Sequence, residues 1–356
     1  LLQLYLGQKA EVPDDGVFLP YVANGVLQVA DLSAMPETLE QRRVIDAGKV
    51  LGPHIVAAAM VDGKPPIWPE GMTSVATTPE QGRQLVRDAK AQGYDLMKVY
   101  SKLELPVFQA LVAEAKALHV PVVGHIPARD KGITSEFFIP GFGMVAHAEE
   151  FAQQTALPDH GAIPRYIELL RANGTGVIAT LTVDDRILQI MRQPESLRSR
   201  PELGYLHPVL RNVVVEHNPY AARAKDAGYI EKIVAFNRDF VRQAHRAGIP
   251  VLAGTDAPVP GVAPGFALHD ELQSLVAAGL SNYEALAAAT TAPARWLGQQ
   301  GQRGSIERGA HADMVLLDAD PLADIGNTRR IAAVIVRGAV YPRAELDKRM
   351  EALRKR

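Results

Sequence analysis

Short apolar runs alternate with amphipathic helical stretches from residue 24 to about residue 298. One helical stretch, residues 79–92, carries Leu85, Val86 and Ala89 at helical spacing. The runs that predict strands are residues 25–31, 55–60, 95–100, 120–125, 143–147, 176–181 and 249–256. Repeated strand–helix units of this size predict an α/β fold with parallel strands and right-handed crossovers.

The predicted strands number seven, whereas a closed (β/α)₈ TIM barrel needs eight. An open, doubly wound sheet could manage with seven, so the count alone does not decide between the two folds. Between the last two strands lies a long insertion, residues 183–232, which contains Pro194, Pro201, Pro208 and Pro219. Long insertions between a strand and a helix often act as lids. A surface excursion or an oligomer contact is an equally good interpretation.

The pattern changes after residue 300. Residues 304–309 are expected to form a strand and turn, and residues 312–318 and 331–338 to form two further strands. These strands amount to half of a small β-sandwich domain and cannot bury both faces alone. We therefore expect the other half, and the first barrel strand, to precede Leu1. The predicted domains are a barrel at 1–300, part of the β domain at 301–345 and a C-terminal helix at 346–356.

Four polar residues lie at the C-terminal ends of predicted strands, where a barrel enzyme keeps its chemistry: Lys98, His125, His147 and Asp256. Each alone has an ordinary structural role, such as a snorkelling lysine, a core histidine or a helix-capping aspartate. Together they predict a metal site, because imidazole and carboxylate are ligands of zinc and similar metals. A desolvated lysine is also nucleophilic, and can capture carbon dioxide as an anionic carbamate.

Composition narrows the possible partners of the chain. The sequence has 356 residues, of which 47% are apolar, and a net charge of −2. This charge favours neither nucleic acid nor an anionic membrane surface as a partner. No apolar run approaches the roughly 20 residues that cross a bilayer. There is no cysteine, which excludes disulfides and thiolate zinc sites but leaves the choice between a cytoplasmic and a periplasmic or secreted location open. No signal peptide is visible.

Several motifs resemble those of the amidohydrolase superfamily, metal-dependent hydrolases built on a (β/α)₈ barrel. Residues 94–100, 124–125, 146–149 and 254–256 resemble its ligand motifs on strands 4, 5, 6 and 8. Residues 269–272, 277–281, 288–290 and 304–315 resemble the imidazolonepropionase-like and Xaa-Pro dipeptidase-like branch. The superfamily's His-x-His pair of strand 1 is absent, because all ten histidines here are isolated. We expect that pair to precede Leu1; the alternative is an inactive member.

The resemblance implies two divalent metal ions, zinc foremost, bridged by a carbamate on Lys98. His125 and His147 would hold one ion, and Asp256 with the absent His-x-His pair the other. Asp256 would take a proton from a metal-activated water and deliver it to the leaving amine. Tyr100 would bind the substrate carbonyl or carboxylate, although packing of its ring is an equal alternative. His269 would orient a substrate group, unless it is merely a helix-terminal surface residue.

The segment 94–100 further resembles dipeptidases and carboxypeptidases. It implies hydrolysis of a dipeptide or N-acyl amino acid with a free carboxylate, which an arginine not identified by the sequence would bind. One alternative is a cyclic amidohydrolase or a deaminase on the same scaffold. Another is a catalytically inactive barrel with a binding or assembly role. The family also implies a homo-oligomer, with no nucleic acid or membrane partner.

Overall fold

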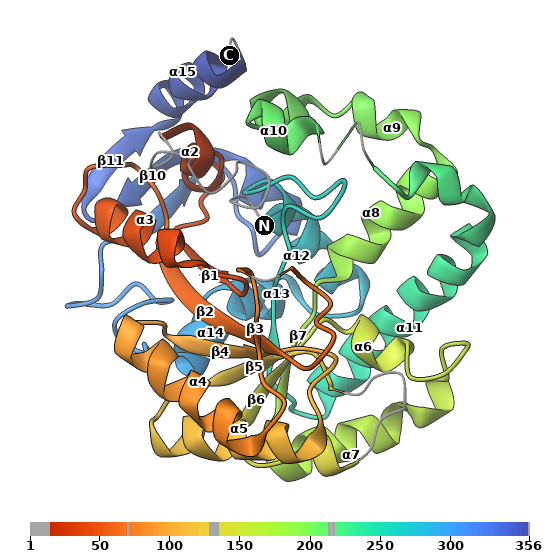
Figure 1. Ribbon diagram of the computed structural model, residues 1–356. Helices are drawn as coiled ribbons and strands as arrows, with labels where there is room; N and C mark the ends of the chain where they lie inside the picture. Colours follow the sequence, from red (N-terminus) through yellow and green to blue (C-terminus); the bar gives the residue numbers. More distant parts are fainter. Residues whose placement is uncertain (1–14, 70, 128–134, 213–214, 216–217, 355–356) are drawn as a thin grey trace.

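Seven parallel strands form the curled sheet at the centre of the molecule (Figure 1). The computed structural model describes residues 15–69, 71–127, 135–212, 215 and 218–354. The strands, in spatial order, are β1 (Gln28–Asp31), β2 (His54–Asp62), β4 (Leu96–Val99), β5 (Val122–Gly124), β6 (Phe142–Ala146), β7 (Gly176–Ile178) and β8 (Val251–Leu252). A short strand that the sequence pattern did not predict, β3 (Ser74–Val75), pairs with β2.

This sheet confirms the predicted α/β barrel architecture. Each strand pairs in parallel with its neighbour, and the register places Lys98 of β4 between Met60 of β2 and Val123 of β5. Within the described part of the chain, no ladder joins β1 to β8, which are the two ends of the strand order. Residues 1–14 lie outside the described part. The strand expected before Leu1 stays a prediction.

Helices cover the outer face of the sheet and begin at local sequence signals. α4 (Pro79–Gln92), for example, starts at a capping box in which the Thr78 side chain accepts from the Gln81 amide. The other helices are α2 (Asp15–Ala23), α3 (Pro36–Asp46), α5 (Leu105–Ala117), α6 (Glu149–Ala152), α7 (Ile163–Asn173), α8 (Leu181–Arg192), α9 (Glu195–Arg198), α10 (Pro208–Arg211), α11 (Ala227–Arg246), α12 (Ala267–Ala277), α13 (Asn282–Ala289), α14 (Thr291–Trp296) and α15 (Arg343–Arg354). The 3₁₀ helices are η2 (Ser135–Phe137), η3 (His160–Ala162), η4 (Pro201–Tyr205), η6 (Ala221–Asp226) and η7 (Ile325–Arg329).

Strand alternation divides the core into two layers. Leu96 and Val123 pack inside the barrel, whereas their neighbours Met97 and Val122 pack against the surrounding helices. Because side chains alternate along a strand, Lys98 and His125, each two residues further on, belong to the interior face. The fold therefore directs both side chains into the mouth of the barrel.

The predicted insertion after β7 folds mainly into α8, α9, η4, α10 and η6. Its apolar residues Ile190, Leu197 and Leu203 form a small core with Ala263, from the loop that follows β8. Arg200 also donates a 3.1 Å hydrogen bond to the Gly261 carbonyl of the same loop. The insertion therefore packs against the loop that carries Asp256, on the face where the site was predicted.

The C-terminal segment forms one antiparallel sheet of three strands, β9 (Met314–Leu317), β10 (Ile331–Val336) and β11 (Ala339–Pro342). The prediction of a strand at residues 304–309 is wrong, because this stretch forms turns. Gly304 there has φ +80°, and a Cβ at this position would lie 2.5 Å from the Thr290 carbonyl oxygen. The last helix begins at Arg343, three residues before the predicted boundary. Among the described residues, every helix is too short or too polar to span a bilayer.

Candidate metal centre

Lys98 is a buried lysine in the mouth of the barrel. Its side chain is 6% exposed, and no hydrogen bond or ion pair within the described residues involves its amine. Burial lowers the pKa of Lys98, against the weaker raising effects of the negative charges of Asp256, Glu150 and Asp31. Within the described residues the amine thus lacks a hydrogen-bonding partner, and it carries its proton less firmly than an exposed lysine does.

His125 is held by a carboxylate that the sequence interpretation did not identify. Its Nδ1 lies 3.1 Å from Oε1 of Glu150, a fully buried residue on α6. The other carboxylate oxygen of Glu150 accepts a 3.0 Å hydrogen bond from the Ile126 amide. A carboxylate can only accept, so it favours the tautomer with the proton on Nδ1 and leaves Nε2 as an acceptor.

His147 reaches the same place through an unusual backbone conformation. Val145, two residues earlier, packs toward the helices, so strand alternation alone would direct His147 away from the barrel mouth. Instead its φ is +79°, in the left-handed region, and its ring centroid lies 5.1 Å from that of His125. A strained non-glycine residue of this kind is typical of a functional site.

The ring of His147 is oriented by Thr180. Its Nδ1 lies 3.0 Å from the Thr180 hydroxyl, which follows β7. Burial lowers the pKa of His147 to about 4, although the charge of Asp256 acts in the opposite direction. His147 is therefore a neutral imidazole at neutral pH, the form that binds a metal.

Asp256 lies at the open side of this group. Its backbone has φ +47°, and the residue is exposed, unlike Lys98, His125 and His147. Its charge raises the pKa of both Lys98 and His147. The glycine at 254 is required for the approach of this segment, because a Cβ there would lie 2.4 Å from Ile178 Cγ2. The structure thus brings all four predicted residues to one face, with Asp256 at its rim.

Tyr100 lies on the same face as Lys98, as predicted. The Lys98 amine is 5.3 Å from the centroid of its ring, and the ring of His125 is 4.0 Å away. The ring also packs against Met35, Met60 and Met72. A contact between its hydroxyl and a substrate stays a prediction.

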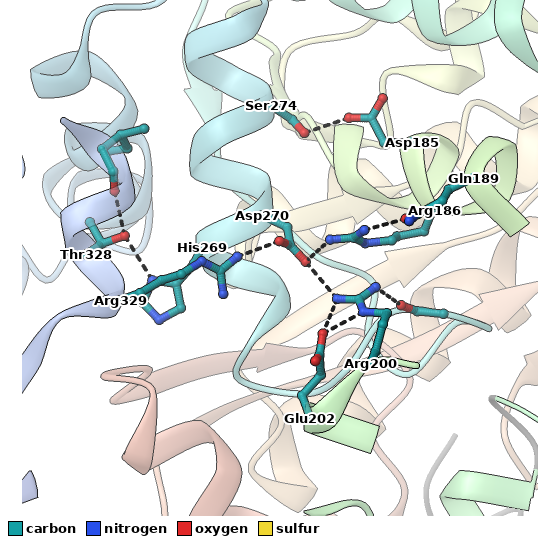
Figure 2. A network of polar contacts seen from close by, with 12 residues as sticks. Asp185, Arg186, Gln189, Arg200, Glu202, His269, Asp270, Ser274, Thr328 and Arg329 are labelled. Carbon is teal, nitrogen blue, oxygen red and sulfur yellow. Dashed lines mark hydrogen bonds and ion pairs between the residues drawn. The ribbon is translucent and has the colours of Figure 1, made fainter. Parts of the chain in front are cut away.

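His269 belongs to a different set of contacts. It is buried on α12, and its Nδ1 lies 3.0 Å from the hydroxyl of Thr328 in η7. Burial lowers its pKa to about 4. The neighbouring Asp270 binds Arg186, Arg200 and Arg329 (Figure 2). No contact among the described residues joins His269 to the group at the barrel mouth, so its position is that of a residue linking α12 to the C-terminal segment.

The donors at the barrel mouth fit a metal ion. The Nδ1 atoms of His125 and His147 are both taken by neighbouring oxygens, while neither Nε2 has a hydrogen bond within the described residues. This is the usual arrangement of metal-binding histidines and their supporting residues. No three His, Asp or Glu side chains of the described chain are close enough to hold one ion. Lys98 in a modified form could supply a further ligand near these two imidazoles.

Glu150→Gln is expected to weaken metal binding by about 10- to 100-fold. A glutamine has one accepting oxygen, which cannot serve both His125 Nδ1 and the Ile126 amide. Competition with a chromophoric chelator measures the affinity. Glu136→Gln, on exposed η2, is the matched control. Equal affinity in the two variants would show that Glu150 does not orient His125.

Comparisons with known proteins identify a matching family. The profile of the Amidohydrolase family matches residues 25–340. An uncharacterized protein of Mycobacterium tuberculosis is 31% identical over 190 residues, which cover 53% of this chain and 45% of that protein. The chain thus spans about half the length of the curated relatives that it matches.

Two solved structures show the same fold over nearly the whole chain. The bottromycin amidohydrolase has a TM-score of 0.73 and 25% identity, and the match covers 95% of this chain and 77% of that one. A Xaa-Pro dipeptidase with methionine in its active site has a TM-score of 0.65 and 20% identity, covering 94% and 82%.

Proposed function

This chain belongs to the amidohydrolase family, and we propose that it is a metal-dependent hydrolase of amide bonds. The observation that carries the proposal is the group of Lys98, His125 and His147 at the barrel mouth, with two oriented imidazoles and an unpaired buried amine. A binding protein has no need for a desolvated lysine beside two oriented imidazoles, whereas a metal-dependent hydrolase does.

His125 and His147 would hold a divalent ion, zinc foremost, and Lys98 would bridge it to a second ion as a carbamate. When bound, such ions lower the pKa of water toward neutrality and polarise the scissile carbonyl. The carboxylate of Asp256 would accept the proton of the attacking water and return it to the leaving nitrogen. Its exposure at the rim supports this role, because substrate and water reach it directly.

The substrate that we propose is a dipeptide or an N-acyl amino acid with a free carboxylate. The segment Tyr94–Tyr100 supports this choice through its resemblance to dipeptidases, and a Xaa-Pro dipeptidase shares the fold. Tyr100, beside His125, is placed to bind the carbonyl or carboxylate of such a substrate.

We expect the full-length, metal-loaded protein to release free amino acids from a panel of dipeptides and N-acyl amino acids, as measured by mass spectrometry. Chelation should reduce the rate to background, and added zinc should restore it, because His147 is neutral and its Nε2 is available to the metal. Elemental analysis should give two ions per chain.

Three results would separate the alternatives. Turnover of a cyclic amide or ester, but of no dipeptide or N-acyl amino acid, would reject the proposed substrate and keep the family. One ion per chain with release of ammonia would indicate a deaminase. A metal-loaded protein inactive on every amide would favour a binding or assembly role.

A further inference from the structure

The threonine that begins α8 does not cap that helix. A threonine at this position ordinarily accepts a hydrogen bond from a backbone amide in the first turn. Thr180 makes no such bond; its φ is +50°, and its hydroxyl lies 3.0 Å from His147 Nδ1 instead. The first amides of α8 therefore need another acceptor, because unpaired buried amides are costly.

Glu271, on α12, supplies that acceptor from 89 residues away in the sequence. Its side chain is fully buried, and Oε2 accepts a 2.8 Å hydrogen bond from the Thr182 amide. Burial raises the pKa of Glu271 to about 8, while the amides of Thr182, Leu181 and Gly254 act in the opposite direction. The carboxyl group thus faces the start of α8.

We propose that Glu271 is a positioning residue that caps α8 in place of Thr180, which leaves the Thr180 hydroxyl to orient His147. The expected effect on catalysis rests on the proposed hydrolase function, whereas the effect on the orientation of His147 does not.

The test compares Glu271→Met, Glu271→Gln and Ser274→Ala. Methionine matches the length of glutamate but accepts no hydrogen bond from an amide, whereas glutamine keeps one accepting oxygen for Thr182. Ser274 is the matched control, since it also joins α12 to α8, through a 2.6 Å bond to Asp185 (Figure 2). We measure kcat and KM on a hydrolysed amide, together with the ring-nitrogen NMR signals of His147, assigned with His147→Gln.

We expect Glu271→Met to lower kcat by about 10- to 100-fold, as loss of a supporting residue does, with a much smaller change in KM. It should also shift the His147 ring signals. Glu271→Gln should recover most of the loss, and Ser274→Ala should change neither kcat nor the signals. If Ser274→Ala matches Glu271→Met, or if Glu271→Met leaves His147 unchanged, the proposal is overturned.

Thr180→Val covers the case in which Glu271→Met does not fold. This variant keeps the Glu271 cap but removes the hydroxyl that contacts His147, so it should reproduce the NMR shift in a folded protein. Unchanged His147 signals would show that the Thr180 hydroxyl does not orient His147, which would overturn the proposal. Because these signals need no turnover, failure of the hydrolase proposal would leave this test intact.

Discussion

Lys98→Met is expected to lower kcat/KM by at least about 10³-fold, a loss of about 4 kcal/mol in transition-state stabilisation. Methionine has a similar length and suits the apolar barrel interior around β4, but it cannot form a carbamate. Since Lys98 is buried without a hydrogen bond or ion pair among the described residues, its replacement should not lower the melting temperature. Lost activity with an unchanged melting temperature would show that Lys98 has a functional role rather than a packing role.

Two further measurements sharpen this prediction. Wild-type protein labelled with ¹³C-bicarbonate should show a carbamate NMR signal that is absent from Lys98→Met. Activity should also fall in wild-type protein reloaded with metal in buffer free of carbon dioxide. Lys116→Met, at an exposed position on α5, is the control and should behave as wild type. Retention of more than a tenth of the activity by Lys98→Met would contradict the carbamate role.

Sequence alone predicted that the four candidate residues would lie at one end of the barrel, because their positions depend on strand ends, which local patterns identify. Parallel strands bring their carboxyl ends to one edge, so Lys98 and His125 followed directly from alternation along β4 and β5. His147 reached the same edge for a reason that alternation does not give, a left-handed φ.

The supporting residues could not be predicted in this way. Glu150 left one local signal, its position three residues after His147, but its contact with His125 depends on how α6 packs beneath β5. Glu271 and the Thr182 amide meet only through the packing of α12 on α8. Such contacts join distant segments, and no periodicity in the sequence encodes them. The same limit explains His269, whose ring contacts Thr328, 59 residues further along the chain; its contact with a substrate stays a prediction.

Asp256→Asn is expected to lower kcat for amide hydrolysis by about 10²- to 10⁴-fold, the usual contribution of general acid–base catalysis. The backbone should be unaffected, because asparagine also tolerates the left-handed φ of +47°. The turn is held by main-chain contacts, including a 3.0 Å bond from the Val259 amide to the Asp256 carbonyl, which the substitution keeps. The loss would therefore report the proton-transfer step.

The leaving group provides a more specific readout of that step. A dipeptide amine must be protonated as it leaves, whereas a nitroanilide needs less assistance. Asp256→Asn should accordingly lose more activity on the dipeptide than on the anilide. Asp88→Asn, on the exposed face of α4, is the control. Equal losses on both substrates would assign Asp256 to metal binding alone. An active Asp256→Asn variant would show that Asp256 has no part in the mechanism. An active parent protein with an inactive variant would exclude the hypothesis of a catalytically inactive barrel.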